Sequence, residues 1–342
     1  MRNRLKHPGP KRAPGERSLI QRIRGRAGLL AAPRITLGIG DDCALLAVRS
    51  GEELAVTTDL SIAGRHFRLD WHPPEVVGHR TLARGLSDLA AMGARPLAAF
   101  LSLGLPQELT KTKDRKKAWV DRFFDGFLAL AEACQTPLAG GDLAQAPLAV
   151  ADIVLVGAIP RGRALLRSGA RAGDLLYVTG RLGGAAAGLA KLEELAACRK
   201  GPPRISPGMR ERLAAHLFPE PRIAQGLWLQ RRRLATAAMD LSDGLSTDLA
   251  HLCDESGLAA EVDARLLPIH SAANLEQALH GGEDYELLFT APAMTRIPRL
   301  IAGVAVTKVG RMVRRRGGQG MVTLRTSDGV EPLQPRGWEH FA

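Results

Sequence analysis

The segment MDLSDGLSTDL, residues 239–249, contains the pattern that decides the fold. An apolar run ends at Asp240, a turn follows, and apolar residues then recur at helical spacing until Gly257. This spacing predicts a strand, a turn and a helix over 245–256 that ends at the glycine. The turn places acidic side chains at the end of the strand, although Asp243 could instead cap the helix.

The same combination of an acidic residue with glycine, or with the end of an apolar run, recurs along the chain. It occurs in GIGDDCALL (38–46), TTDL (57–60), LSDLAAMGA (86–94), GGDL (140–143) and GGEDYELLF (281–289). Each motif alone also fits an ordinary turn, and Asp88 also fits an exposed i, i+4 ion pair with Arg84. Together, carboxylates that converge beside exposed backbone amides suit hard cations that bridge phosphates, because Mg²⁺ prefers oxygen ligands.

Short apolar runs alternate with helical patterns along the chain. Strands are expected over 54–58, 97–103, 153–159 and 175–178, and helices over 74–92, 119–134 and 185–197. This alternation predicts an α/β or α+β protein, and a length of 342 residues predicts two domains. Three prolines among basic residues predict a disordered tail over 1–14, and Pro160-Arg161-Gly162 is the expected boundary between domains at 15–160 and 161–342.

The positive charge of the chain is concentrated at its N-terminus. Lys and Arg outnumber Asp and Glu by 47 to 35, but the first 26 residues carry nine basic residues against one acid, Glu16. Because the rest of the chain is nearly balanced and aromatic residues make up only 4%, we expect no nucleic-acid partner. Four cysteines without a C-x-x-C pair, and apolar runs too short to span a bilayer, predict a cytoplasmic protein without membrane contact.

Other common catalytic motifs are missing from the sequence. The glycine-rich stretch TGRLGGAAAGLAK (179–191) lacks the ending of a P-loop and the spacing of a dinucleotide-binding motif, so we expect it to serve close packing. The chain also lacks G-x-S-x-G and H-E-x-x-H, and it gives no reason to expect a covalent nucleophile.

In order and spacing, the acidic motifs resemble those of the thiamine-monophosphate kinase family, in the superfamily of aminoimidazole ribonucleotide synthetase. GIGDDCALL, MDLSDGL and GGEDYELLFT are the most specific, TGRLGGAAAGL and TTDLSIAGRHF add to them, and the similarity runs from Gly15 to Phe341. The resemblance implies a homodimer whose N-terminal domains pair to form a β-barrel, each with a larger C-terminal α/β domain. It also implies transfer of the ATP γ-phosphoryl group to thiamine monophosphate, which gives thiamine diphosphate.

The resemblance implies a role for each residue that matches a family motif. Several Mg²⁺ ions would be held by acidic and hydroxyl side chains, namely Asp42, Thr57, Thr58, Asp59, Asp88, Asp142, Asp240 and Asp243. The catalytic residues among them would be Asp42, Asp88 and Asp240. ATP would contact Gly141, Asp142, Arg167 and Ser242. Thiamine monophosphate would contact His66, Glu283 and Trp338, because Trp338 can stack on the cationic thiazolium ring and Glu283 adds negative charge.

The sequence departs from the family pattern at three places. Leu143-Ala144-Gln145 stands where the family usually has Thr-Thr-Arg, Gly85 stands in place of Asn, and Arg80 or Arg84 replaces a Lys. These changes keep a second hypothesis open, a catalytically impaired protein that binds thiamine phosphates. Another ATP-using member of the superfamily is a further alternative. The selenophosphate synthetases and the hydrogenase-maturation relative are disfavoured, because no cysteine precedes Cys43 and none ends the chain.

The chemistry implied by the family favours direct in-line transfer without a phosphoenzyme. The second pKa of a phosphate monoester is about 6, so the acceptor oxygen is already anionic at neutral pH and needs no general base. The main barrier is then the repulsion between phosphates, which Mg²⁺ reduces. His66 is the only motif residue able to carry a phosphoryl group, and we expect it to contact the substrate instead.

Overall fold

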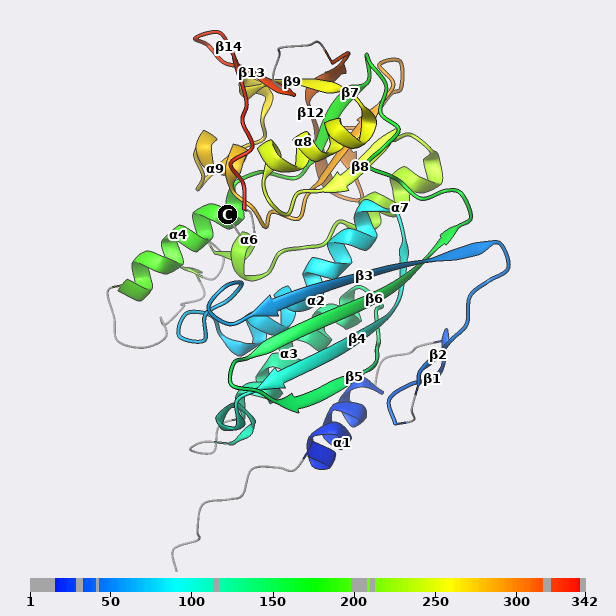
Figure 1. Ribbon diagram of the computed structural model, residues 1–342, viewed down its shortest axis with the longest axis vertical. Coiled ribbons are helices and arrows are strands. Elements are labelled where there is room, and N and C mark those ends of the chain that lie inside the picture. The colour runs from blue at the N-terminus through cyan, green and yellow to red at the C-terminus, as the bar shows by residue number, and fades with distance from the viewer. Residues whose placement is uncertain are drawn as a thin grey trace, which may run out of the picture.

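The computed structural model describes residues 16–28, 33–40, 43–112, 117–197, 208–209, 213–315 and 321–338. The tail predicted over 1–14 lies outside the described residues, and so does Asp42 of the first acidic motif. Within these ranges the chain forms two large sheets with helices packed on them, which confirms the prediction of a mixed α/β protein (Figure 1). No helix in the same ranges is long and apolar enough to cross a membrane.

The N-terminal half is built on a four-stranded sheet with the strand order β3-β6-β4-β5. Its strands are β3 (Glu52–Ile62), β4 (Arg95–Leu105), β5 (Leu138–Gln145) and β6 (Val150–Pro160). β6 pairs antiparallel with β3 and β4, whereas β5 pairs parallel with β4. β3 and β5 are therefore the two edges, and no closed barrel forms within the described residues of one chain. A short ribbon of β1 (Ile35–Leu37) and β2 (Leu45–Leu46) completes this half.

Two helices, α2 (Pro74–Ala91) and α3 (Trp119–Ala133), cover one face of this sheet (Figure 1). α2 begins with a proline, which is tolerated there because the first helical N–H groups have no partner within the helix. The two helices pack closely because Gly78 of α2 lies against a carbonyl of α3, where a Cβ would clash. α1 (Glu16–Ala27) and the short η1 (Gln107–Thr110) lie beside α3.

The C-terminal half is built on an eight-stranded sheet, in which β14-β13-β9-β12-β7-β10-β8 follow one another and β11 pairs with β12. The strands are β7 (Leu175–Thr179), β8 (Ala237–Asp240), β9 (Ala259–Asp263), β10 (Leu287–Ala291), β11 (Leu300–Ile301), β12 (Val304–Val313), β13 (Val322–Arg325) and β14 (Val330–Pro332). The helices are α4 (Gly184–Ala197), α6 (Ala214–Leu217), α7 (Ile223–Arg232), α8 (Leu245–Ser256), α9 (Leu275–His280) and the short η2 (Ala264–Leu266). As predicted, α8 ends at Gly257, whose φ of 66° is left-handed.

α2 also connects the two halves of the molecule. Its C-terminal part packs against α7 and β8, and Gly226 of α7 lies against a carbonyl of α2, where a Cβ would clash. Arg80, Arg84 and Asp88 follow one another at intervals of four residues, so they share one side of the helix. α2 therefore carries a row of charged side chains to the junction between the halves.

Candidate active site

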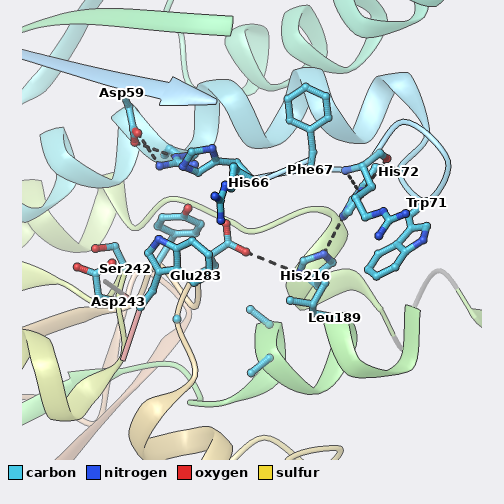
Figure 2. Close-up of a pocket in the computed structure, with 18 of the residues that line it drawn as sticks. Asp59, His66, Phe67, Trp71, His72, Leu189, His216, Ser242, Asp243 and Glu283 are labelled. Atoms are coloured by element: carbon cyan, nitrogen blue, oxygen red, sulfur yellow. Dashed lines mark hydrogen bonds and ion pairs between the residues drawn. The ribbon is translucent and has the colours of Figure 1, made fainter. Parts of the chain in front are cut away.

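A cavity of about 480 Å³ lies between the two halves (Figure 2). Its walls come from β3 and the loop after it, α2, α4, the turn between β8 and α8, the segment 282–285, and the C-terminal part of the chain. Eight of the residues implied by the motifs line it: Asp59, His66, Asp88, Asp240, Ser242, Asp243, Glu283 and Trp338. Side chains that are far apart in the sequence thus meet in one site.

Three carboxylates form one end of the cavity, which we call the acidic end: Asp59 on β3, Asp88 on α2 and Asp240 at the end of β8. Asp88 accepts a hydrogen bond from the hydroxyl of Thr57. Asp240 accepts one from Ser87 Oγ at 2.6 Å. These two acids are held by neutral hydroxyl groups, which orient a carboxylate but do not balance its charge.

Asp59 differs from the other two acids because it has a positive partner. Arg84 Nε lies 3.0 Å from one carboxylate oxygen of Asp59, and Arg84 Nη2 lies 2.7 Å from the other. Arg84 therefore pairs with Asp59 on β3. The i, i+4 ion pair between Arg84 and Asp88, considered from the sequence, is wrong.

Burial raises the pKa values at the acidic end. Asp240 is 4% exposed, and burial is the main reason why the pKa of this carboxyl lies above its ordinary value. Burial also raises the pKa of Asp88 to about 7, and the charges of Asp240 and Asp59 add to the effect. The charge of Arg167 opposes both shifts. The positive charge near the acidic end therefore does not balance its carboxylates, and a bound cation would provide the missing positive charge.

The turn between β8 and α8 places Ser242 and Asp243 in the cavity wall (Figure 2). Gly244 adopts a φ of 113°, and a Cβ there would lie too close to the backbone of His280. Asp248 of α8 fixes the turn by accepting hydrogen bonds from the N–H groups of Asp243 and Gly244, at 3.1 and 3.0 Å. The N-cap of α8 is Gly244, so the suggestion that Asp243 caps this helix is wrong.

Glu283 lies next to this turn, because its backbone N–H donates to the Ser242 carbonyl at 2.7 Å; we call its part of the cavity the Glu283 end. Unlike Asp88 and Asp240, Glu283 has a cation of its own. Both carboxylate oxygens lie 2.7 Å from Nη2 of Arg80, a side chain that is only 5% exposed. Burial alone would raise the pKa of Glu283, but the charge and the hydrogen bonds of Arg80 lower it below its ordinary value. Glu283 is therefore ionised at neutral pH.

Two buried histidines support Arg80. Arg80 donates a hydrogen bond to the backbone carbonyl of His216, and His216 Nε2 lies 3.0 Å from Nε2 of His72 (Figure 2). Burial, and then the charge of Arg80, lower the pKa of His72 to about 4 and that of His216 well below its ordinary value. Both rings are neutral at pH 7, so Arg80 supplies the positive charge opposite Glu283.

The segment GGEDYE (281–286) holds Glu283 in a restricted backbone. Glu283 and Tyr285 have φ values of 67° and 50°, in the left-handed region that non-glycine residues rarely adopt. Their N–H groups donate to carbonyls that follow β8, and the Asp284 carboxylate accepts from Gly183 N–H at 2.6 Å. The glycine-rich turn before α4 therefore anchors this segment, in addition to the packing role expected from the sequence.

Aromatic side chains and a histidine form much of the remaining wall. Trp338 lines the cavity with 49% of its surface exposed, and its backbone N–H donates to the Asp243 carbonyl at 3.1 Å. His66 Nδ1 accepts a hydrogen bond from the N–H of Ile62 at 3.1 Å. Phe67 and Trp71 lie along the same loop (Figure 2). Together with the ionised Glu283, this wall suits a flat cationic ring.

Comparison with known proteins assigns the family. The model of AIR synthase related protein, N-terminal domain, matches residues 40–159, and that of the C-terminal domain matches residues 171–323. The thiamine-monophosphate kinase of Escherichia coli (strain K12) is 40% identical over 345 residues, which cover 96% of this chain and 98% of that protein. The chain belongs to the thiamine-monophosphate kinase family.

Solved structures of thiamine-monophosphate kinases have the same fold. The crystal structure of the enzyme from Stenotrophomonas maltophilia K279a is 37% identical, with a TM-score of 0.75, and covers 91% of this chain and 96% of that one. A structure of AaThiL complexed with AMPPCP and TMP is 32% identical, with a TM-score of 0.72, and covers 96% and 97% of the two chains. The family expected from the acidic motifs is confirmed.

Some residues implied by the thiamine-monophosphate kinase family lie away from the cavity of a single chain. Thr57 reaches its edge through the hydrogen bond to the acidic end, whereas Thr58, the next residue on β3, faces the other side of the sheet. Gly141 and Asp142 are exposed on β5, at the far edge of the sheet. Arg167, exposed in the loop after β6, does not line the cavity, but its charge acts on Asp88 and Asp240. Gly141 has a φ of 145° and lies against a carbonyl of β4, where a Cβ would clash.

Other site residues were not identified by motif. Arg80 entered the sequence analysis only as one candidate for a replaced Lys, and its partner Glu283 lies 203 positions away. His72 and His216 belong to no motif and are separated by 144 positions. The four-residue spacing of Arg80, Arg84 and Asp88 was the one available signal, because it places all three on one side of a helix.

Proposed function

We propose that the protein transfers the γ-phosphoryl group of ATP to thiamine monophosphate and so produces thiamine diphosphate. The solved complex of a relative with AMPPCP, an ATP analogue, and TMP supports this substrate pair. The observation that carries the proposal is the contrast within one cavity. Asp88 and Asp240 have no ion pair among the described residues, whereas Glu283, which lines the same cavity as Trp338, is ionised beside Arg80. The acidic end suits cation-bridged phosphates, and the Glu283 end suits a cationic ring.

The acidic end fits Mg²⁺ ions. Its donors are oxygen atoms, and its carboxylates lack positive partners apart from Arg84 on Asp59. In the described parts of the chain, no three His, Cys, Asp or Glu side chains form a complete metal site. Mg²⁺ usually keeps waters and phosphate oxygens, so a few protein ligands suffice. The proposed ligands are Asp42, Thr57, Thr58, Asp59, Asp88, Asp142, Asp240 and Asp243, with Thr58 contributing its backbone carbonyl because its side chain faces the other side of the sheet. Bound Mg²⁺ would reduce the repulsion between donor and acceptor phosphates.

The other residues divide between the two substrates. For ATP we propose contacts with Gly141, Asp142, Arg167 and Ser242. For thiamine monophosphate, Trp338 would stack on the thiazolium ring, the Glu283 carboxylate would face its positive charge, and His66 would lie against the same molecule. In this arrangement the substrate phosphate points from the Glu283 end towards the acidic end.

We propose direct in-line transfer. The acceptor phosphate is already an anion at neutral pH, so none of the cavity residues needs to remove a proton from it. Asp88 and Asp240 would act by fixing the cations that align the two phosphates, and Glu283 and Trp338 by orienting the acceptor. A phosphorylated His66, isolated after incubation with ATP alone, would contradict this mechanism.

Homodimerisation through the N-terminal domain, predicted over 15–160, would explain the position of Asp142. Asp142 is in register with Ser102 on β4, then Asp152 on β6 and Leu60 on β3. Three strand spacings of about 4.8 Å place it roughly 14 Å from β3, too far to share an ion with Asp59 of the same chain. Closing two open sheets into a barrel would bring β5 of one subunit beside β3 of the other.

Exposed apolar side chains on β3 support such a barrel. Leu54, Val56 and Leu60 are 50%, 61% and 45% exposed in the single chain. Mixing inactive Asp142→Asn and Asp240→Asn subunits tests the shared site. A shared site predicts recovery of about a quarter of the activity, because half of the dimers are mixed and each of these has one intact site. No recovery in proven mixed dimers would place Asp142 and Asp240 in the same chain's site.

The proposed activity is tested with purified protein, ATP, Mg²⁺ and thiamine monophosphate. We expect thiamine diphosphate and ADP in equal amounts, and no product when Mg²⁺ is chelated. Binding of thiamine monophosphate without turnover would instead favour the catalytically impaired binder, and ATP use with a different acceptor would favour another member of the superfamily. The cytoplasmic location and the lack of a nucleic-acid partner stay predictions from the sequence.

A further inference from the structure

Arg84 is a cationic side chain inside the cavity to which the family motifs assign no role. It extends from the middle of α2, lines the cavity, and is 16% exposed. Its contacts with both oxygens of Asp59, at 3.0 and 2.7 Å, are the ion pair drawn beside Asp59 in Figure 2. The guanidinium of Arg84 is therefore paired with Asp59, the carboxylate through which β3 would bind a cation.

The place of Arg84 on α2 puts it between the two ends of the cavity. Arg80, one turn earlier, is engaged by Glu283, and Asp88, one turn later, belongs to the acidic end. Burial alone would lower the pKa of Arg84, but the nearby groups of Tyr285, Asp59 and Glu283 raise it. Arg84 is thus a permanent cation on the cavity wall, one helical turn from the acidic end.

The geometry of the ion pair suits an exchange of partners. A guanidinium binds a carboxylate and a phosphate through the same planar pair of N–H groups, so one can replace the other without a change of backbone. A divalent cation that takes the oxygens of Asp59 competes directly with Arg84 for them. The released side chain is then available to an incoming phosphate.

We propose that Arg84 binds the phosphate of the acceptor substrate after a cation has replaced it on Asp59. The proposal rests on the function proposed above and deepens it, because it assigns recognition of the phosphate group to one side chain. In the metal-free protein Arg84 holds Asp59 in place. In the loaded protein it would allow the site to discriminate thiamine monophosphate from thiamine, which has the same rings and no phosphate.

The discrimination is measured by calorimetric binding of thiamine monophosphate and of thiamine, with Mg²⁺ and a non-hydrolysable ATP analogue present. Arg84→Gln should weaken binding of the monophosphate by about 10- to 100-fold, the range for charge-assisted hydrogen bonds, and leave thiamine binding unchanged. Arg84→Lys should restore part of the difference because it keeps the charge. Arg122→Gln is the matched control, because it removes an arginine paired with Glu75 outside the cavity.

A second readout uses Mg²⁺ alone. Without nucleotide, Arg84→Gln should bind Mg²⁺ several-fold more tightly than the unsubstituted protein, because Asp59 no longer has a competing cation. An unchanged ratio of monophosphate to thiamine affinity in Arg84→Gln would overturn the proposal, whether both affinities stay the same or fall equally. Mg²⁺ binding no tighter than in the unsubstituted protein would also overturn it. Failure of the unsubstituted protein to bind thiamine monophosphate would contradict the proposed function itself, and the role of Arg84 with it.

Discussion

The two ends of the cavity treat buried carboxylates in opposite ways. At the Glu283 end, Arg80 lies 2.7 Å from both oxygens of Glu283 and lowers the pKa of this carboxyl despite its burial. At the acidic end, the hydroxyl groups of Thr57 and Ser87 donate to Asp88 and Asp240, neither acid forms an ion pair with a described residue, and burial raises both pKa values. A carboxylate paired with an arginine stays ionised, whereas a buried carboxylate without a cationic partner needs a bound cation to stabilise its charge.

This difference assigns different tasks to the two ends. The Glu283 end is complete before any ligand arrives, because Arg80, His216 and His72 fix its charge and position. On the proposed function, the acidic end would become balanced when cations bind. Substitutions at the acidic end should therefore change metal dependence and rate, and substitutions at the Glu283 end should change stability and affinity for the acceptor.

The largest effect is expected from Asp240→Asn. Removing a buried charge proposed to hold Mg²⁺ should lower the rate of thiamine diphosphate formation by about 1,000-fold or more, since cations supply much of the charge stabilisation in phosphoryl transfer. Initial rates at saturating ATP measure this loss. Asp263→Asn is the control, because Asp263 pairs with Arg265 outside the cavity. A near-normal rate in Asp240→Asn would show that Asp240 is not a Mg²⁺ ligand needed for the reaction.

Arg80→Met should have the next largest effect, on stability and acceptor affinity together. It leaves Glu283 ionised beside a buried apolar side chain, which should lower the free energy of unfolding by about 3 kcal/mol. Urea unfolding measures this change. The double variant Arg80→Met with Glu283→Gln should recover part of it, because no unpaired charge remains. Equal destabilisation of the single and double variants would show that Arg80 acts through packing alone.

Trp338→Ala should have a smaller and more selective effect. Loss of a cation–π contact should weaken binding of thiamine monophosphate by about 1 to 2 kcal/mol and leave ATP binding unchanged. Separate titrations with each ligand test this split. Trp338→Phe should keep most of the affinity because it keeps an aromatic ring. Both variants keep the hydrogen bond from the backbone N–H of residue 338 to the Asp243 carbonyl. A parallel loss of ATP binding would show that the substitution disturbs the turn after β8.

Deletion of residues 1–14 is expected to have the smallest effect. This segment has no motif and no apolar periodicity, so the truncated protein should keep the rate and the proposed dimeric state of the full chain. Turnover and the mass of the assembly in solution check both. A collapse of either would give the basic tail a structural role.

The sequence predicted the elements more successfully than their contacts. α8 and its glycine end followed from helical spacing and from the conformational freedom of glycine, both of which are local properties. The family motifs predicted eight residues that line the cavity. Ser242 and Asp243 lie at a turn, as expected for the acidic motifs, whereas Asp59 and Asp88 lie within β3 and α2. Their relative positions depend on how two sheets pack against α2, which no local pattern contains.

Pairings across the fold were therefore the weakest point of the sequence reasoning. From the sequence, Asp88, one turn along the same helix, was the ion-pair partner considered for Arg84, whereas its partner in the structure is Asp59 on β3. Asp142 and Asp59 both belong to acidic motifs, yet the strand order β3-β6-β4-β5 separates them within one chain. Spacing alone does not provide strand order or the partner of a buried charge.

We expect Mg²⁺ to displace protons from the carboxyl groups of the acidic end, and to displace none from Glu283. In the metal-free folded protein the pKa of Asp88 is about 7, above its ordinary value of 3.8. The folded state therefore binds more protons than the unfolded chain between these two pKa values, so its stability should fall as the pH rises from about 4 through about 7 and then level off.

Calorimetric titration with Mg²⁺ at pH 7, in buffers of different ionisation enthalpy, measures the protons released on binding. We expect release of on the order of one proton, reduced in Asp88→Asn and unchanged in Glu283→Gln. Mg²⁺ binding without proton release, or release that disappears only in Glu283→Gln, would contradict it.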